Sequence, residues 1–73
     1  MASKQKLNYT DGENHYFFTI ENGLYNVLWK WDKEKKKPVM AKWGQLNDKK
    51  HISREFNLKR VPVKDQETVF INQ

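Results

Sequence analysis

Hydrophobic and polar residues alternate along the first half of the chain with the period of two that is typical of β-strands. Residues 15–20 and 24–31 are rich in aromatic and β-branched side chains, which favour strands. Between them lies Asn22-Gly23, a dipeptide that readily adopts the positive φ angles of a tight hairpin turn. The pattern therefore predicts an antiparallel hairpin around this turn.

The register of this hairpin decides which side chains share a face of the sheet. We expect Glu21 to pair with Leu24 across the turn, and a third strand to follow the lysine-rich loop at 32–38. One face then carries nearly all the apolar side chains, which are Tyr16, Phe18, Ile20, Tyr25, Val27, Trp29, Trp31, Val39, Ala41 and Trp43. The opposite face is expected to be mixed.

The second half of the chain has a weaker pattern. Residues 51–60, "HISREFNLKR", fit a strand slightly better than a short helix. In the helical alternative Asp48 is the N-cap, and Ile52 and Phe56 stack one turn apart. Residues 67–72, "ETVFIN", predict a final strand.

A chain of 73 residues has room for one hydrophobic core. We expect residues 1–6 to form a flexible basic tail and residues 7–73 to form a single small β domain. The predicted fold class is all-β, either a small, strongly twisted antiparallel sheet or an SH3-like or OB-like barrel of five to six short strands. One short helical turn near residues 48–57 is an open alternative within this fold.

The composition bears on the compartment in which the protein is expected. The chain contains no cysteine, which excludes disulfide bonds and thiolate metal ligands. No apolar stretch is long enough for a secretory signal or a transmembrane segment. We expect a cytoplasmic protein of bacterial or phage type, or one in the host cytoplasm if it is viral.

Charge is distributed unevenly along the chain. The net charge is +5, yet residues 7–29 hold three acids and no lysine or arginine. Residues 30–60 hold eleven lysines and arginines against four acids. This asymmetry favours a polyanion or an acidic protein as partner, although a lysine-rich surface also occurs where there is no ligand at all.

Residues 24–46 hold all three tryptophans and six of these lysines. Truncating a buried tryptophan costs roughly 3–5 kcal/mol, whereas a base stacked on an aromatic ring contributes about 1–3 kcal/mol to binding. Folding therefore has the first claim on these rings, and we expect Trp29 to lie in the core. The other apolar residues are too few to cover every ring, so we expect Trp31 and Trp43 to stay accessible.

The sequence contains little that indicates a catalytic site. The chain lacks a P-loop, a dinucleotide-binding fingerprint and metal-ligand spacing. His51, Arg54 and Glu55 have the chemistry of an RNA-cleaving site, but a strand would point Arg54 away from the other two. We expect no enzymatic activity, no metal and no cofactor.

The leading hypothesis is a small basic module that binds single-stranded or structured nucleic acid, with cations contacting phosphates and aromatic rings stacking on bases. The candidate binding residues are Lys30, Trp31, Lys35, Lys36, Lys37, Lys42, Trp43, Lys49, Lys50 and Arg54. The alternative is a protein-binding module, a small regulator or inhibitor that docks through a tryptophan-rich patch. We expect no membrane contact, and an unpaired edge strand would permit a homodimer.

Overall fold

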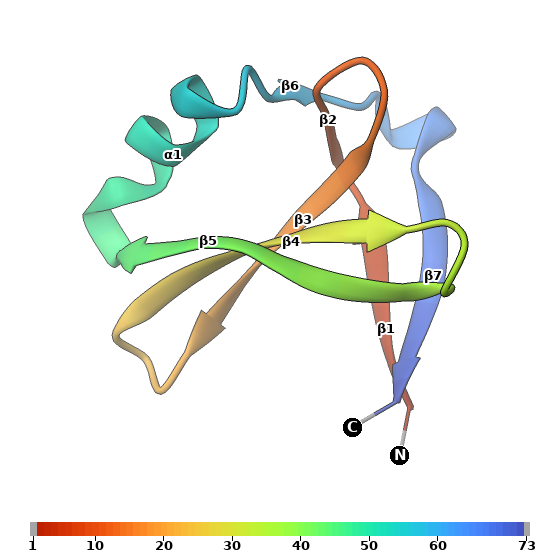
Figure 1. The fold of residues 1–73 in the computed structure, drawn as a ribbon, viewed down its shortest axis with the longest axis horizontal. Helices are drawn as coiled ribbons and strands as arrows, with labels where there is room; N and C mark the ends of the chain where they lie inside the picture. Colours follow the sequence, from red (N-terminus) through yellow and green to blue (C-terminus); the bar gives the residue numbers. More distant parts are fainter. Residues whose placement is uncertain (1, 73) are drawn as a thin grey trace.

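The computed structural model describes residues 2–72 and contains two antiparallel sheets and one short α-helix (Figure 1). The strands are β1 (Ala2–Leu7), β2 (Tyr9–Thr10), β3 (His15–Glu21), β4 (Tyr25–Asp32), β5 (Lys37–Gln45), β6 (Lys59–Arg60) and β7 (Glu67–Asn72). The helical segments are the 3-10 turns η1 (Leu46–Asp48) and η2 (Val63–Asp65) and helix α1 (Lys49–Glu55). The larger sheet has the order β5-β4-β3-β2-β6, and β1 pairs with β7 in a two-stranded ribbon.

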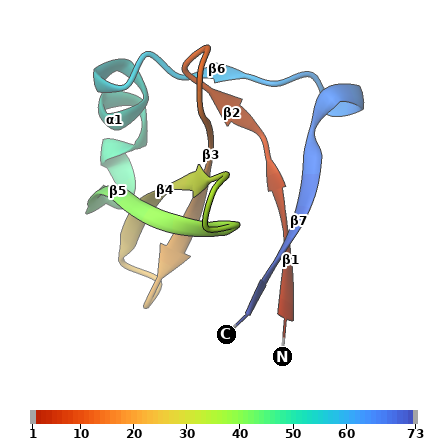
Figure 2. The ribbon, with the colours of Figure 1, turned by 45° about the vertical axis from the view of Figure 1, so that its right-hand side comes forward.

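This architecture confirms the predicted all-β fold with a helical turn near residues 48–57. Within residues 2–72 the two sheets do not close into a barrel. Figure 2 shows the β1–β7 ribbon standing beside the meander of β3, β4 and β5. The chain passes from the ribbon to the larger sheet at Asn8, whose carbonyl accepts a hydrogen bond from the Val61 N–H (3.0 Å).

The flexible tail expected at residues 1–6 is instead a strand from Ala2 onward, and residue 1 lies outside the described residues. β1 pairs with β7 along its whole length, so the predicted final strand is confirmed and has a partner. Burial alternates along β1: Lys4 and Lys6 are exposed, whereas Leu7 is buried. The sequence hides this alternation because serine and glutamine occupy the other inward positions.

The predicted hairpin is present as β3 and β4, but its register differs by one residue. Asn22 and Gly23 have φ angles of 55° and 65°, and the Leu24 N–H donates to the Glu21 carbonyl at 3.0 Å. Beyond this turn Glu21 stands opposite Tyr25 and not opposite Leu24. Leu24 is therefore an extra residue outside the ladder.

This one-residue shift changes the composition of both faces of the sheet, because side chains alternate along a strand. Phe17 stands opposite Trp29, and Phe18 stands opposite Leu28. The prediction of a single apolar face is therefore wrong. Both faces are apolar at the middle of β4.

A bulge in β5 also redirects side chains. The register between β4 and β5 shifts between Leu28 and Trp29, which leaves Ala41 as an extra residue. Because a bulge re-aims the residues beyond it, Met40 joins Trp43 on one face although three positions separate them. Ala41, expected on the same face as Trp43, packs against the cluster on the other side.

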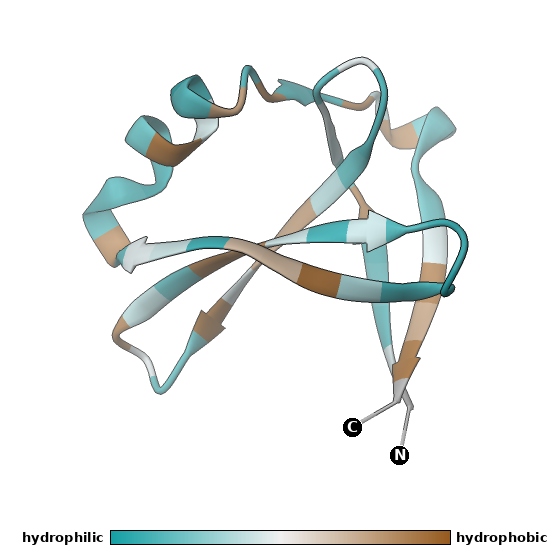
Figure 3. Ribbon diagram, viewed as in Figure 1, coloured by the Kyte–Doolittle hydropathy of each residue, from teal (hydrophilic) through white to brown (hydrophobic). Residues whose placement is uncertain are grey.

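The larger sheet thus buries side chains on both faces. α1 covers one face, here termed the helix side, where the buried residues are Tyr16, Leu28 and Ile52. The ribbon covers part of the other face, here termed the ribbon side, where the buried cluster is Leu7, Phe17 and Val69. Figure 3 shows apolar positions on the strands and α1, while the β4–β5 turn is hydrophilic.

Residues 49–55 form α1, so the helical alternative is correct and the slightly favoured strand is wrong. Ile52 is 2% exposed, and Phe56, one turn later, packs against the same helix-side cluster. A helix places both side chains on the face toward the sheet and leaves Arg54 exposed, whereas a strand would put Arg54 on the same side as Ile52 and Phe56. Asp48 precedes α1, but its carboxylate accepts the Gln45 N–H (3.0 Å) and does not cap the helix.

Substitution of Ile52 by valine tests the helix-side core. Removing one methylene from this buried position should lower the free energy of unfolding by about 0.5–1.5 kcal/mol. The matched control is Ile20→Val, because Ile20 is 64% exposed and its truncation should change stability by less than about 0.5 kcal/mol. Urea denaturation measures both effects. Equal losses at the two positions would contradict the packing of α1 on the sheet.

The turn between β2 and β3 is organised around the Asp11 carboxylate. This carboxylate accepts the N–H groups of Asn14 (2.7 Å) and Glu13 (2.9 Å) and the hydroxyl of Tyr16 (2.8 Å). These hydrogen bonds, the one from Asn14 above all, lower the pKa of Asp11 from 3.8 to about 2. Burial, followed by the hydrogen bond to Asp11, raises the pKa of Tyr16 from 10.0 to about 12.

Both shifts make stability depend on pH. The pKa of Asp11 is lowered by folding, so its contribution is present above about pH 4 and lost as the pH falls toward 2. The pKa of Tyr16 is raised, so its contribution is present below about pH 10 and lost as the pH rises toward 12. Chemical denaturation measures the free energy of unfolding of the native protein and of each variant. The difference between the native protein and Asp11→Asn should become smaller as the pH falls, and the difference between the native protein and Tyr16→Phe should become smaller at alkaline pH. Differences that do not vary with pH would refute this coupling.

Candidate functional surfaces

Five exposed cations lie on α1 and β6, which adjoin along the upper edge of Figure 1. They form what is termed here the cationic surface: Lys49, Lys50, Arg54, Lys59 and Arg60. Residues 49–60 contain a single acid, Glu55. Its carboxylate forms an ion pair with Lys42 on β5 (3.7 Å), so little negative charge opposes these cations.

Packing against aromatic rings brings the two elements of this surface together. The Lys49 Nζ and the Arg60 guanidinium carbon each lie 5.8 Å from the centroid of the Tyr9 ring. Lys49 also lies 5.2 Å from the Phe18 ring, which meets Tyr9 edge to face with centroids 5.5 Å apart. Cation–π attraction thus fixes cations of α1 and β6 on side chains of β2 and β3.

A shallow hollow lies where the end of α1 leads into β6. Arg54 and Lys59 line it together with Ser53, Asn57 and Leu58. The hydroxyl and the amide are hydrogen-bond donors, and the two cations supply positive charge. This combination suits the oxygens of a phosphate group.

The structure gathers part of the predicted binding set in this region. Lys49, Lys50 and Arg54 belong to the cationic surface, and Lys42 adjoins it through its ion pair with α1. Lys30 shares the helix side of the sheet, by its position in the β3–β4 ladder.

The other predicted lysines, Lys35, Lys36 and Lys37, stand at the β4–β5 turn, at the opposite end of the molecule from α1 (Figure 1). The Asp32 carboxylate organises this turn by accepting the N–H groups of Glu34 (3.0 Å) and Lys35 (3.1 Å). The hydrogen bond from Lys35 lowers the pKa of Asp32. Asp32 is therefore ionised and, with Glu34, offsets part of the charge of this turn.

A second exposed surface lies on the ribbon side of the sheet, beyond the area that the ribbon covers. It is termed here the aromatic surface and consists of Tyr25 on β4 and Met40 and Trp43 on β5, with Glu21 at its margin. The buried Val27 also lines it. Trp43 is 57% exposed and Met40 is 58% exposed. The rings of Tyr25 and Trp43 meet edge to face with centroids 5.5 Å apart.

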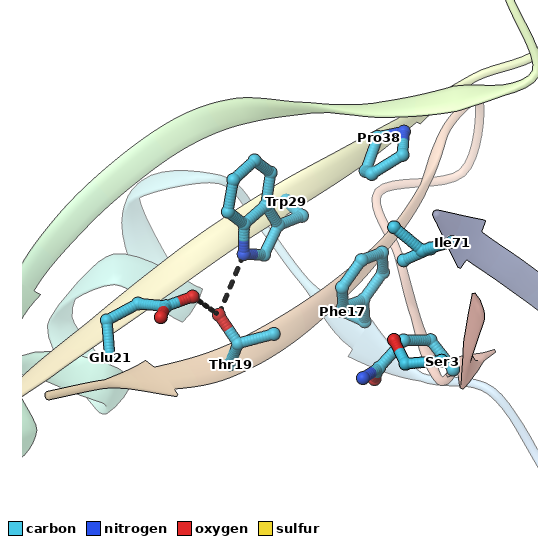
Figure 4. A pocket seen from close by; sticks show the side chains of 8 residues that line it. Ser3, Phe17, Thr19, Glu21, Trp29, Pro38 and Ile71 are labelled. Carbon is cyan, nitrogen blue, oxygen red and sulfur yellow. Dashed lines mark hydrogen bonds between the residues drawn. The ribbon is translucent and has the colours of Figure 1, made fainter. Parts of the chain in front are cut away.

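The three tryptophans differ in their surroundings. Trp43 is exposed as predicted, whereas Trp31 is partly buried against the ribbon-side cluster, contrary to expectation. Trp29, expected in the core, packs on the same cluster and is also partly buried. Its indole N–H donates to the Thr19 hydroxyl (2.8 Å), and that hydroxyl donates to the Glu21 carboxylate (3.1 Å) (Figure 4).

Trp29 also lines a cleft between the ribbon and the sheet, with Phe17, Pro38 and Ile71 among its neighbours (Figure 4). The volume of this cleft is about 190 Å³. Sites for small molecules usually measure roughly 300–1,000 Å³. The two open surfaces are therefore better candidates for function than this cleft.

The candidate catalytic set lies within α1. In a helix His51, Arg54 and Glu55 share one side, whereas in a strand Arg54 would point away from the other two. Glu55 is, however, paired with Lys42. Among residues 2–72 no group of three or more histidines and acids could hold a metal ion. The same part of the chain contains no helix of the length and apolarity needed to cross a membrane.

Sequence reasoning missed important members of both surfaces. Arg60 stands opposite Tyr9, and Lys59 opposite Thr10, only because β6 pairs with β2. Two strands of two residues each leave no periodic pattern in the sequence. Met40 was missed because the bulge reverses its direction. The signal that could have revealed the cationic surface is the excess of five cations over one acid in residues 49–60.

Comparison with protein-family models, with curated proteins and with solved structures gives no match to this chain. Inference about function therefore depends on the chemistry of the two surfaces.

Quenching of tryptophan fluorescence by acrylamide tests the difference between the three indoles. Because Trp43 is the most exposed of the three indoles, Trp43→Phe should remove most of the quenching seen in the native protein. Trp31→Phe should leave that quenching nearly unchanged, since its ring packs on the ribbon-side cluster. Quenching that is insensitive to Trp43→Phe would mean that the aromatic surface is covered in solution.

Proposed function

We propose that this protein is a module that binds single-stranded or structured nucleic acid, and that the cationic surface makes the phosphate contacts. The observation that carries this proposal is the convergence of five exposed cations from α1 and β6, with the one acid among them engaged by Lys42. Lysine and arginine attract phosphates and release the counterions that surround nucleic acid. Such contacts position a nucleic acid without reading its sequence.

Stacking on bases has a smaller role in this proposal than the sequence suggested. Trp43 lies on the ribbon side of the sheet, whereas α1 covers the helix side. Tyr9 and Phe18, the rings next to the cations, are partly buried and lie close to Lys49. Binding should therefore show little base preference and a strong dependence on salt.

Binding of a labelled single-stranded oligonucleotide, measured by fluorescence anisotropy, tests the salt dependence. If about five phosphates are neutralised on a single strand, the logarithm of affinity should fall against the logarithm of salt with a slope near −3.5. Affinity should then drop roughly a hundredfold between 50 and 200 mM salt. Absence of oligonucleotide binding at the lower salt concentration would refute the proposal.

A pair of charge-matched variants locates the contacts. Arg54→Glu with Lys59→Glu reverses two cations that line the hollow, and the salt slope should fall from about −3.5 to about −2 because two phosphate contacts are lost. Lys35→Glu with Lys36→Glu changes the net charge equally at the β4–β5 turn and should leave the slope unchanged. The same loss in both variants would mean that net charge, and not this surface, governs binding.

A further inference from the structure

The aromatic surface lies beside an open sheet edge. β5 is the outermost strand of the larger sheet, and among residues 2–72 no strand pairs with its outer side. β5 spans nine residues, and Pro38, the bulge at Ala41 and its two lysines limit indiscriminate pairing along this edge. Met40 and Trp43 project from this strand to the ribbon side, where the ribbon does not cover them.

The aromatic surface has the composition of a binding hot spot. Tyrosine, tryptophan and methionine are enriched at the centres of protein interfaces, where a few such side chains carry most of the binding energy. The contact between Tyr25 and Trp43 fixes both rings before any partner arrives, which lowers the entropy lost on binding. The bulge at Ala41 contributes to this surface because it brings Met40 to the same face as Trp43.

The charge of β5 indicates what kind of segment fits its edge. The strand carries Lys37 and Lys42 and no acid. A second copy of β5 would add two lysines and no acid to this edge, so it would offer these cations no opposite charge. An acidic segment would instead gain attraction from these lysines. A homodimer through this edge is therefore disfavoured relative to an acidic partner.

Lys42 can leave its ion pair with Glu55 and form one with a carboxylate of a bound partner. Its ion pair with Glu55 is 3.7 Å long, and both side chains are 47% exposed. Exposed ion pairs of this kind stabilise a protein by about 0–1 kcal/mol, so a carboxylate from a partner can compete with Glu55 at little cost.

We propose that the outer edge of β5 and the aromatic surface bind an extended segment of another protein in which apolar and acidic residues alternate. Successive side chains of a strand point to opposite faces. The apolar side chains of the added strand would contact Met40 and Trp43 on the ribbon side. Its acidic side chains would meet Lys42 on the helix side, where Lys42 stands opposite Leu28.

Synthetic peptides test this inference directly. The probe is an end-capped peptide of about eight residues that alternates valine and glutamate, and its charge-reversed match alternates valine and lysine. In NMR titrations the glutamate peptide should shift the amide signals of β5 and the indole N–H signal of Trp43. The lysine peptide should bind more weakly at low salt. Equal binding of the two peptides, or shifts confined to other elements, would overturn the inference.

Variants separate the apolar and the charged contributions. Trp43→Ala should weaken binding of the glutamate peptide about thirtyfold or more, as expected for a hot spot. Lys42→Gln should weaken it about twofold to fivefold, as expected for an exposed charge pair. The control is Phe70→Ala, since Phe70 is another exposed aromatic residue, 69% exposed, but lies on β7. Comparable losses at Phe70 and Trp43 would overturn the proposed site.

Self-association is the remaining competitor for this edge. Sedimentation measured over a range of protein concentrations should show a monomer at low salt, because a second copy of β5 offers the lysines of this edge no opposite charge. A dimer whose β5 amides are protected from hydrogen exchange would overturn the inference. The proposed phosphate contacts do not include Trp43, so Trp43→Ala should leave oligonucleotide affinity intact, and failure of this inference is distinguishable from failure of the proposed function.

Discussion

The pairing of β3 with β4, with Leu24 left outside the ladder, is the constraint on which the rest of the structure depends. It directs Phe17 to the ribbon side and Leu28 to the helix side, so each face of the hairpin needs its own cover. A helix of seven residues is too short to be stable alone in water. α1 is held because Ile52 fits against Leu28, which is 0% exposed.

Helix α1 covers the helix side of the sheet, and the β1–β7 ribbon covers only part of the ribbon side. This difference in coverage leaves the two surfaces exposed. α1 and its flanking residues shield the helix side with a few apolar contacts and turn their cations to solvent. The ribbon shields Phe17 and the partly buried Trp29, but not the far end of β4 and β5. Leaving Trp43 and Met40 in water forgoes burial that a small domain needs for stability. Their exposure side by side is one observation that supports the binding site proposed at this edge.

The sequence was sufficient to predict the β3–β4 hairpin, β5 and β7, but it favoured a strand where α1 lies and did not predict how the elements pair. The period of two, the Asn22-Gly23 turn and the final strand depend on local chemistry, and all three are present. The register was not predictable because the extra residue Leu24 and the bulge at Ala41 are set by packing on both faces of β4. The cationic surface was only partly predictable because Tyr9 and Arg60 meet through pairing of distant segments. β1 was missed since polar residues occupy most of its inward positions.

The two surfaces meet at the ion pair between Lys42 of β5 and Glu55 of α1. A carboxylate that captured Lys42 would leave Glu55 unpaired among the cations of α1, and its negative charge would then oppose phosphates. An acidic segment on β5 would also lower the positive potential around α1 within about 10 Å at moderate salt. Nucleic acid and an acidic partner would therefore weaken each other's binding, and by thermodynamic linkage the two effects must be equal. The position of the Lys42–Glu55 ion pair would therefore make the two proposed surfaces competitors, although they lie on different faces of the sheet.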